Sequence, residues 1–198
     1  MQTKTRNRKP VSRKELTHER IVEVASRAIR RSGYDGTGVA DIMKEAGLTH
    51  GGFYAHFESR DALLAEAADR AGTESVALAA RVAAAAPPGQ AVQAMMAAYL
   101  SPEHIASIET GCPVSALGSE MPRQSPEVRR AATIHIKEMI DVFARQMPDW
   151  GQPKAHEQAM ALVCALIGTT VMARAVDDPR LSKALCEATM KQFAAAAQ

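Results

Sequence analysis

Few aromatic residues and few cysteines occur in this chain of 198 residues, which has four Phe, three Tyr, one Trp and three Cys. Cys112, Cys164 and Cys186 are odd in number and far apart, so they form no disulfide framework and fit a reducing cytoplasm. No apolar run reaches the roughly 18–20 residues that a membrane span needs. The basic N-terminal segment precedes no apolar signal region. We therefore expect a cytoplasmic protein that does not interact with a membrane.

Alanine and methionine are plentiful, and they are among the residues with the highest helix propensity. Hydrophobic residues make up 46% of the chain and charged residues 23%, as in ordinary globular proteins. The sequence shows no alternation of apolar and polar residues that would indicate strands. It therefore predicts an all-α protein.

Positive charge is concentrated in the first sixty residues, which contain twelve Lys and Arg against seven Asp and Glu. The whole chain has 24 Lys and Arg and 22 Asp and Glu. The remaining residues therefore contain twelve basic and fifteen acidic residues. A basic head on a slightly acidic body is typical of a nucleic-acid-binding protein. A solvated basic tail is the alternative interpretation.

Residues 37–57 predict two short helices joined by a tight turn. The first helix has an apolar face at helical spacing, formed by Val39, Ile42, Met43 and Ala46. Gly47 ends that helix and Thr49 is a suitable N-cap for the next, at 50–57. The second helix is too short to be stable alone and carries Phe53 and Phe57 on one side as an apolar anchor. Its polar and aromatic outer face suits insertion into a DNA groove.

The other predicted helices divide the chain into three parts. Residues 1–12 form a disordered basic arm, 13–60 a helix-turn-helix DNA-binding domain and 61–198 a helical effector-binding and dimerisation domain. A helix over 13–32 precedes the two short ones. Ser59 caps a long fourth helix that ends near residue 86, spans about 40 Å and has a weak point at Gly72. Further helices are expected at 90–100, 102–108, after 113, and at 126–147, 154–176 and 179–197.

The run GYDGTGVADIMKEAGLTHGGFYAHFESRDALL resembles the DNA-binding domain of the TetR family of bacterial transcriptional regulators. The resemblance covers residues 13–65, with departures at Gly38 and Arg60, and is weak over the rest. It implies a three-helix head joined by the long fourth helix to a ligand-binding and dimerisation bundle. It also implies DNA-binding residues: Thr37, Lys44 and Arg60 on phosphates, and Thr49, His50, Gly51, Gly52, Tyr54 and His56 at the major groove. His56 has a second interpretation, as a residue that bonds a neighbour within the head.

Two further sets of residues are candidates for function in the body. An apolar effector pocket is predicted to include Met95, Met96, Tyr99, Cys112, Ile134, Met139, Phe143 and Trp150. The alternative is ordinary core, which is the more frequent role of methionines at helical spacing. The predicted dimer interface consists of Met160, Val163, Cys164, Ile167, Gly168, Val171, Leu181, Leu185 and Ala188. The helix that carries the first six is apolar all round, so it lies either in an interface or in the middle of one core.

Cys112, in the sequence Gly-Cys-Pro, stands before an expected helix start that would lower the pKa of its thiol. Some TetR-like regulators with such a motif respond to electrophiles or oxidants, and the alternative is a small buried apolar residue. The pairs His135–Glu138 and Glu103–His104 do not make a metal site, so no metal or cofactor is predicted.

We expect a homodimeric repressor that binds a palindromic double-stranded DNA operator and is released by a small-molecule effector or an electrophile. Nothing in the sequence suggests catalysis. The competing class is an all-α carrier or enzyme whose basic head is incidental, and specific, salt-dependent DNA binding separates the two classes.

Overall fold

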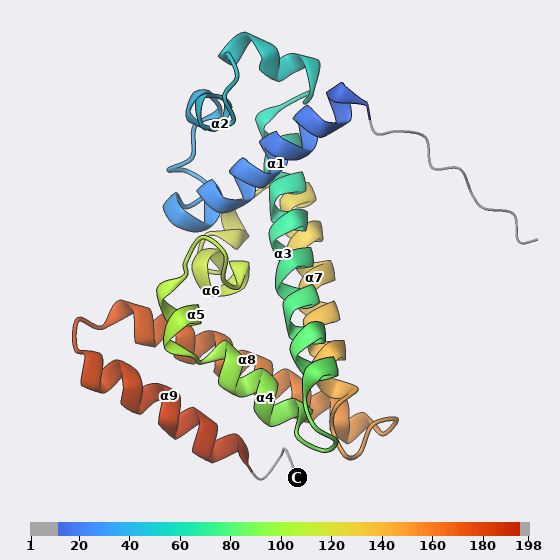
Figure 1. The fold of residues 1–198 in the computed structure, drawn as a ribbon, viewed down its shortest axis with the longest axis vertical. Helices are drawn as coiled ribbons and strands as arrows, with labels where there is room; N and C mark the ends of the chain where they lie inside the picture. Colours follow the sequence, from blue (N-terminus) through green and yellow to red (C-terminus); the bar gives the residue numbers. More distant parts are fainter. Residues whose placement is uncertain (1–11, 195–198) are drawn as a thin grey trace, which may run out of the picture.

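A computed structural model describes residues 12–194, which form helices and no β-strand (Figure 1). The all-α prediction is confirmed. The helices are α1 Arg13–Ser32, α2 Val39–Glu45, η1 His50–Ala55, α3 Arg60–Ala85, α4 Ala91–Tyr99, α5 Pro102–Ala106, α6 Pro113–Leu117, η2 Met121–Arg123, α7 Pro126–Ala144, α8 Pro153–Ala175 and α9 Pro179–Phe193.

The head consists of α1, α2 and η1 packed around the start of α3 (Figure 1). Ser12, which we assigned to the basic arm, instead caps α1 through a reciprocal pair of hydrogen bonds with Glu15. The rest of that arm lies outside the described residues. Gly33 ends α1 at a φ of 77° and Gly47 follows α2 at 70°, left-handed conformations that favour glycine.

Helix α3 has 26 residues and runs from the head into the body, where it packs most extensively against α7 (Figure 1). Ser59 caps it by accepting the Ala62 N–H, as predicted. The expected weak point at Gly72 is wrong, because the helix continues through it. A Cβ there would lie 2.3 Å from the His135 ring, so glycine allows α7 to approach closely.

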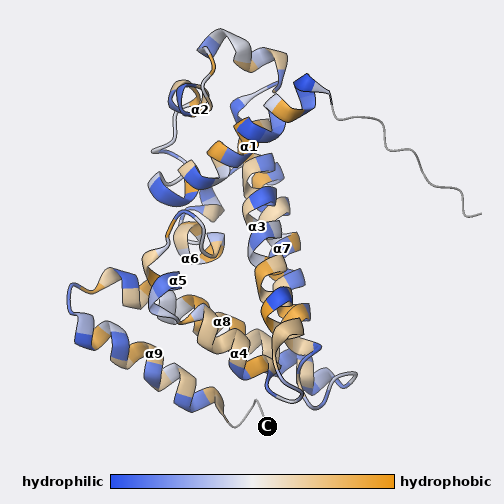
Figure 2. Cartoon of the chain, viewed as in Figure 1, coloured by the Kyte–Doolittle hydropathy of each residue, from blue (hydrophilic) through white to orange (hydrophobic). Residues whose placement is uncertain are grey.

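The body forms a second apolar core from α4, α7 and α8, with α9 antiparallel to α8 (Figure 1). Hydrophobic colours dominate α4 and α8, whereas hydrophilic ones are frequent along α1 (Figure 2). Among residues 12–194, α8 alone is long and apolar enough to cross a membrane by length and composition, a test that core helices of soluble proteins also pass. This differs from our sequence count because the apolar residues of α8 are interrupted by polar ones.

Candidate nucleic-acid interface and effector pocket

The turn between α2 and η1 is fixed by backbone hydrogen bonds around Gly47. Its N–H donates to the Lys44 carbonyl at 2.9 Å, and the Leu48 N–H donates to that of Met43 at 2.8 Å. η1 is a 3-10 helix held by Phe53 and Phe57, which are 2% and 3% exposed. A tight, short helix agrees with the low helix propensity of its two glycines.

The outer face of the two short helices presents most of the predicted base-reading residues. Lys44, Thr49, His50 and Gly51 are exposed, and Tyr54 is 74% exposed. Thr49 occupies the N-cap position, but its hydroxyl makes no cap hydrogen bond, contrary to our expectation. The side chain is therefore free to meet another molecule.

Packing does not require glycine at the two positions inside η1. A Cβ at Gly51 would meet nothing within 4 Å, and one at Gly52 would make only ordinary contact with the Met43 methyl group at 3.7 Å. The glycines nevertheless lower helix stability by about 1 kcal/mol each relative to alanine. Packing within the free protein therefore does not explain why glycine stands at these two positions. Close approach of another molecule's backbone would explain it.

Thr37 and Arg60 were predicted to hold phosphates, but their side chains are occupied within the head. Thr37 is 4% exposed and its hydroxyl donates to the Gly33 carbonyl at 2.6 Å. The Arg60 guanidinium donates to the backbone carbonyls of Tyr34 and Thr37. In this conformation Thr37 ties the α1–α2 turn to α1, and Arg60 ties the same turn to α3. The Thr37 hydroxyl is therefore not available to DNA.

His56 is half-buried, and its surroundings bear on the two interpretations given above. Its ring lies near those of His18 and Phe57, with centroids 6.1 and 6.4 Å away. Burial lowers the pKa of His56, and the nearby His18 and Lys14 lower it further. Its buried Nδ1 has no hydrogen-bond partner among the described residues, so the bond to a neighbour within the head is absent and the contact with phosphate stays a prediction.

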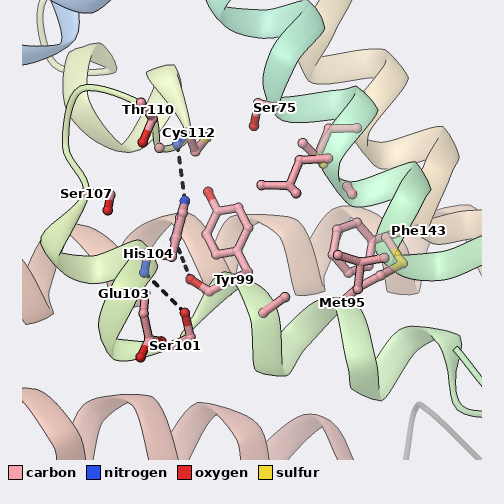
Figure 3. Close-up of a pocket in the computed structure, with 16 residues that line it drawn as sticks. Ser75, Met95, Tyr99, Ser101, Glu103, His104, Ser107, Thr110, Cys112 and Phe143 are labelled. Carbon is pink, nitrogen blue, oxygen red and sulfur yellow. Dashed lines mark hydrogen bonds between the residues drawn. The ribbon is translucent and has the colours of Figure 1, made fainter. Parts of the chain in front are cut away.

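A cavity of about 320 Å³ lies in the body between α3, α4, α7 and the segment 101–112 (Figure 3). Five of the eight predicted pocket residues line it: Met95, Tyr99, Cys112, Met139 and Phe143. The sequence prediction missed the contributions of α3, of one further residue of α4 and of the polar segment, namely Ser75, Leu78, Ala79, Val82, Ala98, Ser101, Glu103, His104, Ser107, Thr110 and Gly111.

Three predicted pocket residues lie elsewhere. Met96 is fully buried, but it packs in the core of the body and does not line the cavity. Ile134 and Trp150 are 51% and 53% exposed. Trp150 lies in the turn between α7 and α8, and Ile134 is on the face of α7 that is turned outwards. The sequence did not fix which side of α7 meets α3.

Hydrogen bonds fix the position of His104 at the polar end of the cavity (Figure 3). Its Nδ1 lies 2.5 Å from the Tyr99 carbonyl, and its Nε2 accepts the Cys112 N–H at 3.2 Å. Because a carbonyl only accepts, Nδ1 carries the proton and the ring is neutral. Burial lowers the pKa of His104, as does the nearby Arg174.

The Tyr99 hydroxyl is a buried donor without a hydrogen-bond partner in the part of the chain that the structure describes. It points towards the Cys112 end of the cavity (Figure 3). Burial raises the pKa of Tyr99 well above its usual range, and the neighbouring Cys112 adds to that effect. The hydroxyl therefore keeps its proton and can donate it to a bound molecule.

Cys112 is 4% exposed and stands at the N-cap position of α6. α6 has only five residues and begins with Pro113, which has no N–H, and the thiol makes no cap hydrogen bond. The helix terminus on which our expectation of thiolate character depended is therefore weak. Instead, the thiol lies in the cavity wall beside the Tyr99 hydroxyl.

Apolar residues are exposed on both α8 and α9, and we call them together the outer face of these helices. Met160, Val171 and Leu181 are 40%, 44% and 46% exposed. Other predicted interface residues are also exposed on these helices, namely Cys164, Gly168 and Ala188. One prediction is wrong, because Val163 is 5% exposed and is buried in the core of the body. Ile167 is half-buried against the same core. Leu185 is half-buried.

An anchored helix-turn-helix with an exposed outer face, joined by one long helix to a cavity-containing body, defines a ligand-responsive DNA-binding regulator. Residues 21–67 match the family described as bacterial regulatory proteins, tetR family. Residues 88–184 match the transcriptional regulator LmrA/YxaF-like C-terminal domain. The chain belongs to the TetR family of transcriptional regulators.

Individual relatives agree with this assignment. The chain is 27% identical to the HTH-type transcriptional regulator LmrA of Bacillus subtilis over 154 residues, or 76% of this chain and 82% of that protein. A TetR regulator from Chloroflexus aurantiacus shares the fold at a TM-score of 0.74 and 24% identity, covering 91% and 96% of the two chains. The reduced form of Escherichia coli NemR shares the fold at a TM-score of 0.73 and 17% identity, covering 89% of this chain and 94% of that chain.

Proposed function

We propose that this protein is a homodimeric repressor that binds a palindromic DNA operator through residues 13–60 and is released when residues 61–198 bind an effector. The observation that carries the proposal is the exposed outer face of the α2–η1 unit, where Lys44, Thr49, His50 and Tyr54 are free while the apolar residues beneath hold their geometry. Two such faces in a dimer would read half-sites about 34–36 Å apart.

The test is a mobility-shift titration with the duplex that flanks the gene of this protein. Specific binding should persist over competitor DNA, and its affinity should fall steeply with salt because phosphate contacts release counterions. The carrier or enzyme alternative predicts only weak binding that is independent of sequence. Absence of specific binding at moderate salt would exclude the proposed repressor.

The cavity supports a small, mainly apolar effector that carries a hydrogen-bond acceptor. Its apolar wall comes from α3, α4 and α7, and the Tyr99 hydroxyl offers one unpaired donor at the other end. A buried donor without a partner is unfavourable by about 1–3 kcal/mol, which a ligand acceptor would recover. A carbonyl compound with an apolar body fits this arrangement.

An electrophile is a second form of effector that one observation favours, the position of Cys112 beside the Tyr99 hydroxyl. In an apolar enone, the Cys112 sulfur would form a bond to the β-carbon while the thiol proton passes to the α-carbon. The Tyr99 O–H would hydrogen-bond the carbonyl oxygen as negative charge develops there. Such an adduct would occupy the same cavity as a reversible effector.

The outer face of α8 and α9 supports the dimer, since its exposed apolar residues would be buried against a second copy. A DNA-binding role and relatives that are named as regulators support a cytoplasmic, non-enzymatic protein. Repression is the typical mode of the family, and reporter expression from the bound promoter would distinguish it from activation.

A further inference from the structure

Residues 109–121, which we call the junction segment, contact both the cavity and the head. Thr110, Gly111 and Cys112 line the cavity. Further along the segment, Leu117 is fully buried in the apolar core of the head, and Met121 packs against that core. The same short stretch of chain therefore forms a wall of the proposed effector site and a support for the DNA-binding domain.

Arg30 is the principal polar link between this segment and the head. It lies in the last turn of α1 and its side chain is fully buried. The guanidinium donates to the Gly111 carbonyl at 3.3 Å, to the Glu74 carboxylate of α3 at 2.9 Å and to the Ser26 carbonyl at 3.0 Å. One side chain thus joins the head, the long connecting helix and the cavity wall.

Other contacts hold the two ends of the junction segment against the head. Glu109 pairs with Arg31 at 3.2 Å, and the Glu120 carboxylate accepts the Tyr34 N–H at 2.8 Å. A buried guanidinium must keep its acceptors, because leaving it unpaired is strongly unfavourable. A displacement of the Gly111 carbonyl therefore has to move Arg30, and α1 with it, or break this network.

We propose that Arg30 couples occupancy of the cavity to the position of the DNA-binding head through the Gly111 carbonyl. This inference rests on the proposed function, in which effector binding in the cavity changes DNA binding by the head. Arg30 is a positioning residue, since it contacts neither the cavity nor the outer face of η1. Its loss should uncouple the two sites.

Gly111 provides a way to disturb the junction segment without any ligand. A Cβ at this position would lie 2.7 Å from the Ser107 carbonyl oxygen, 2.9 Å from Arg174 Nη2 and 3.2 Å from His104 Nε2. A methyl group cannot fit unless these neighbours or the segment itself move. Gly111→Ala should therefore imitate the displacement that an effector causes.

The experiment is a double-mutant cycle between Gly111→Ala and Arg30→Gln. The probe is a duplex that the wild-type protein enriches from a random-sequence library. Gly111→Ala should weaken binding of this duplex by about 5–150-fold, the usual range of coupling between sites. In the Arg30→Gln background the same change should alter binding less than about twofold. An equal loss in both backgrounds, or no loss in either, would overturn the inference.

Arg27→Gln is the matched control for Arg30→Gln. It lies one turn earlier on α1, is exposed and pairs only with Glu23 of the same helix among the described residues. The effect of Gly111→Ala should persist in this background. Its loss there would mean that any change in α1 charge removes the coupling, which contradicts a specific role for Arg30.

Amide hydrogen exchange separates failure of this inference from failure of the proposed function. If the wild-type protein enriches no duplex, the proposed function fails. The coupling is then measured as amide exchange in residues 26–34. Gly111→Ala alone should speed this exchange, whereas Gly111→Ala combined with Arg30→Gln should not speed it relative to Arg30→Gln alone. If Gly111→Ala does not fold, modification of Cys112 by N-ethylmaleimide takes its place as the disturbance. This modification is made in protein that carries Cys164→Ser and Cys186→Ser, so that only Cys112 reacts. Unchanged exchange in residues 26–34 overturns the inference in either case.

Discussion

His104 illustrates how single polar residues shape the cavity wall. Its ring is held by the Tyr99 carbonyl on one side and the Cys112 N–H on the other, and Arg174 donates to the backbone carbonyls of His104 and Ile105. The ring must stay neutral to accept the Cys112 N–H. Protonation would break that bond and place two positive charges close together.

Acid should therefore destabilise the protein through His104. Because its folded-state pKa is lowered below the ordinary 6.5, the unfolded chain binds a proton at a higher pH than the folded chain does. The stabilisation is complete above about pH 6.5 and is lost as the pH falls towards the folded-state pKa. Urea unfolding of wild type and His104→Gln at pH 7.5, 6.5 and 5.5 measures this. The variant should show a shallower pH dependence, and equal slopes would contradict the prediction.

Tyr99→Phe tests the unpaired hydroxyl. Removing a buried donor that has no partner should leave stability unchanged or slightly higher. Reaction of Cys112 with N-ethylmaleimide should slow by about twofold to tenfold, the equivalent of one net hydrogen bond of about 0.5–1.5 kcal/mol. Intact-mass kinetics in Cys164→Ser/Cys186→Ser protein measures the rate. An unchanged rate would show that the hydroxyl does not contact the reacting carbonyl.

At the scale of the helices, η1 divides its residues between anchoring and recognition. Phe53 is 2% exposed and Tyr54, the next residue, is 74% exposed. Phe53→Ala should reduce stability by about 3–5 kcal/mol. Tyr54→Ala should leave stability within about 0.5 kcal/mol but weaken operator binding. Thermal unfolding and mobility-shift titrations compare the two variants, and a Tyr54→Ala protein that binds DNA normally would remove this residue from the interface.

Local sequence rules predicted helix ends better than helix faces. α1 has the bounds that were predicted, and Asp178 caps α9 by accepting two backbone N–H groups, as its position before Pro179 implies. These features depend only on neighbouring residues. The roles of Arg30, Gly72 and Arg60 depend on partners that are 23–81 residues away in the chain, so no local pattern could indicate them.

The candidate sites show the same division. The outer face of η1 followed from the apolar anchor beneath it, whereas Thr37 was misplaced because its acceptors belong to α1 and the following turn. In the pocket, apolar periodicity identified Met95, Met139 and Phe143. It missed His104 and Glu103, since polar residues on a short helix carry no periodic signal.

At the scale of the whole molecule, the hydrogen bonds of Arg30 connect the head to α3 and to the cavity wall of the body. Burial alone raises the pKa of the Glu74 carboxyl, but hydrogen bonds from Arg70 and Arg30 outweigh it and lower the pKa overall. Glu74 is therefore ionised at neutral pH and holds the buried Arg30. The head and the body of one chain are thus connected both by α3 and by the junction segment.

Two such units must associate for a palindromic operator to be read, and the outer face of α8 is where we expect them to meet. Val171→Glu places a charge on that exposed apolar face. Size-exclusion chromatography with light scattering at about 10 µM should show a dimer for wild type and a monomer for the variant. Operator affinity should fall by at least about 100-fold, because two linked half-sites bind far more tightly than one. Ile134→Glu is the control, since Ile134 is 51% exposed and lies on α7 rather than on α8 or α9. A dimeric Val171→Glu, or a monomeric Ile134→Glu, would place the interface elsewhere.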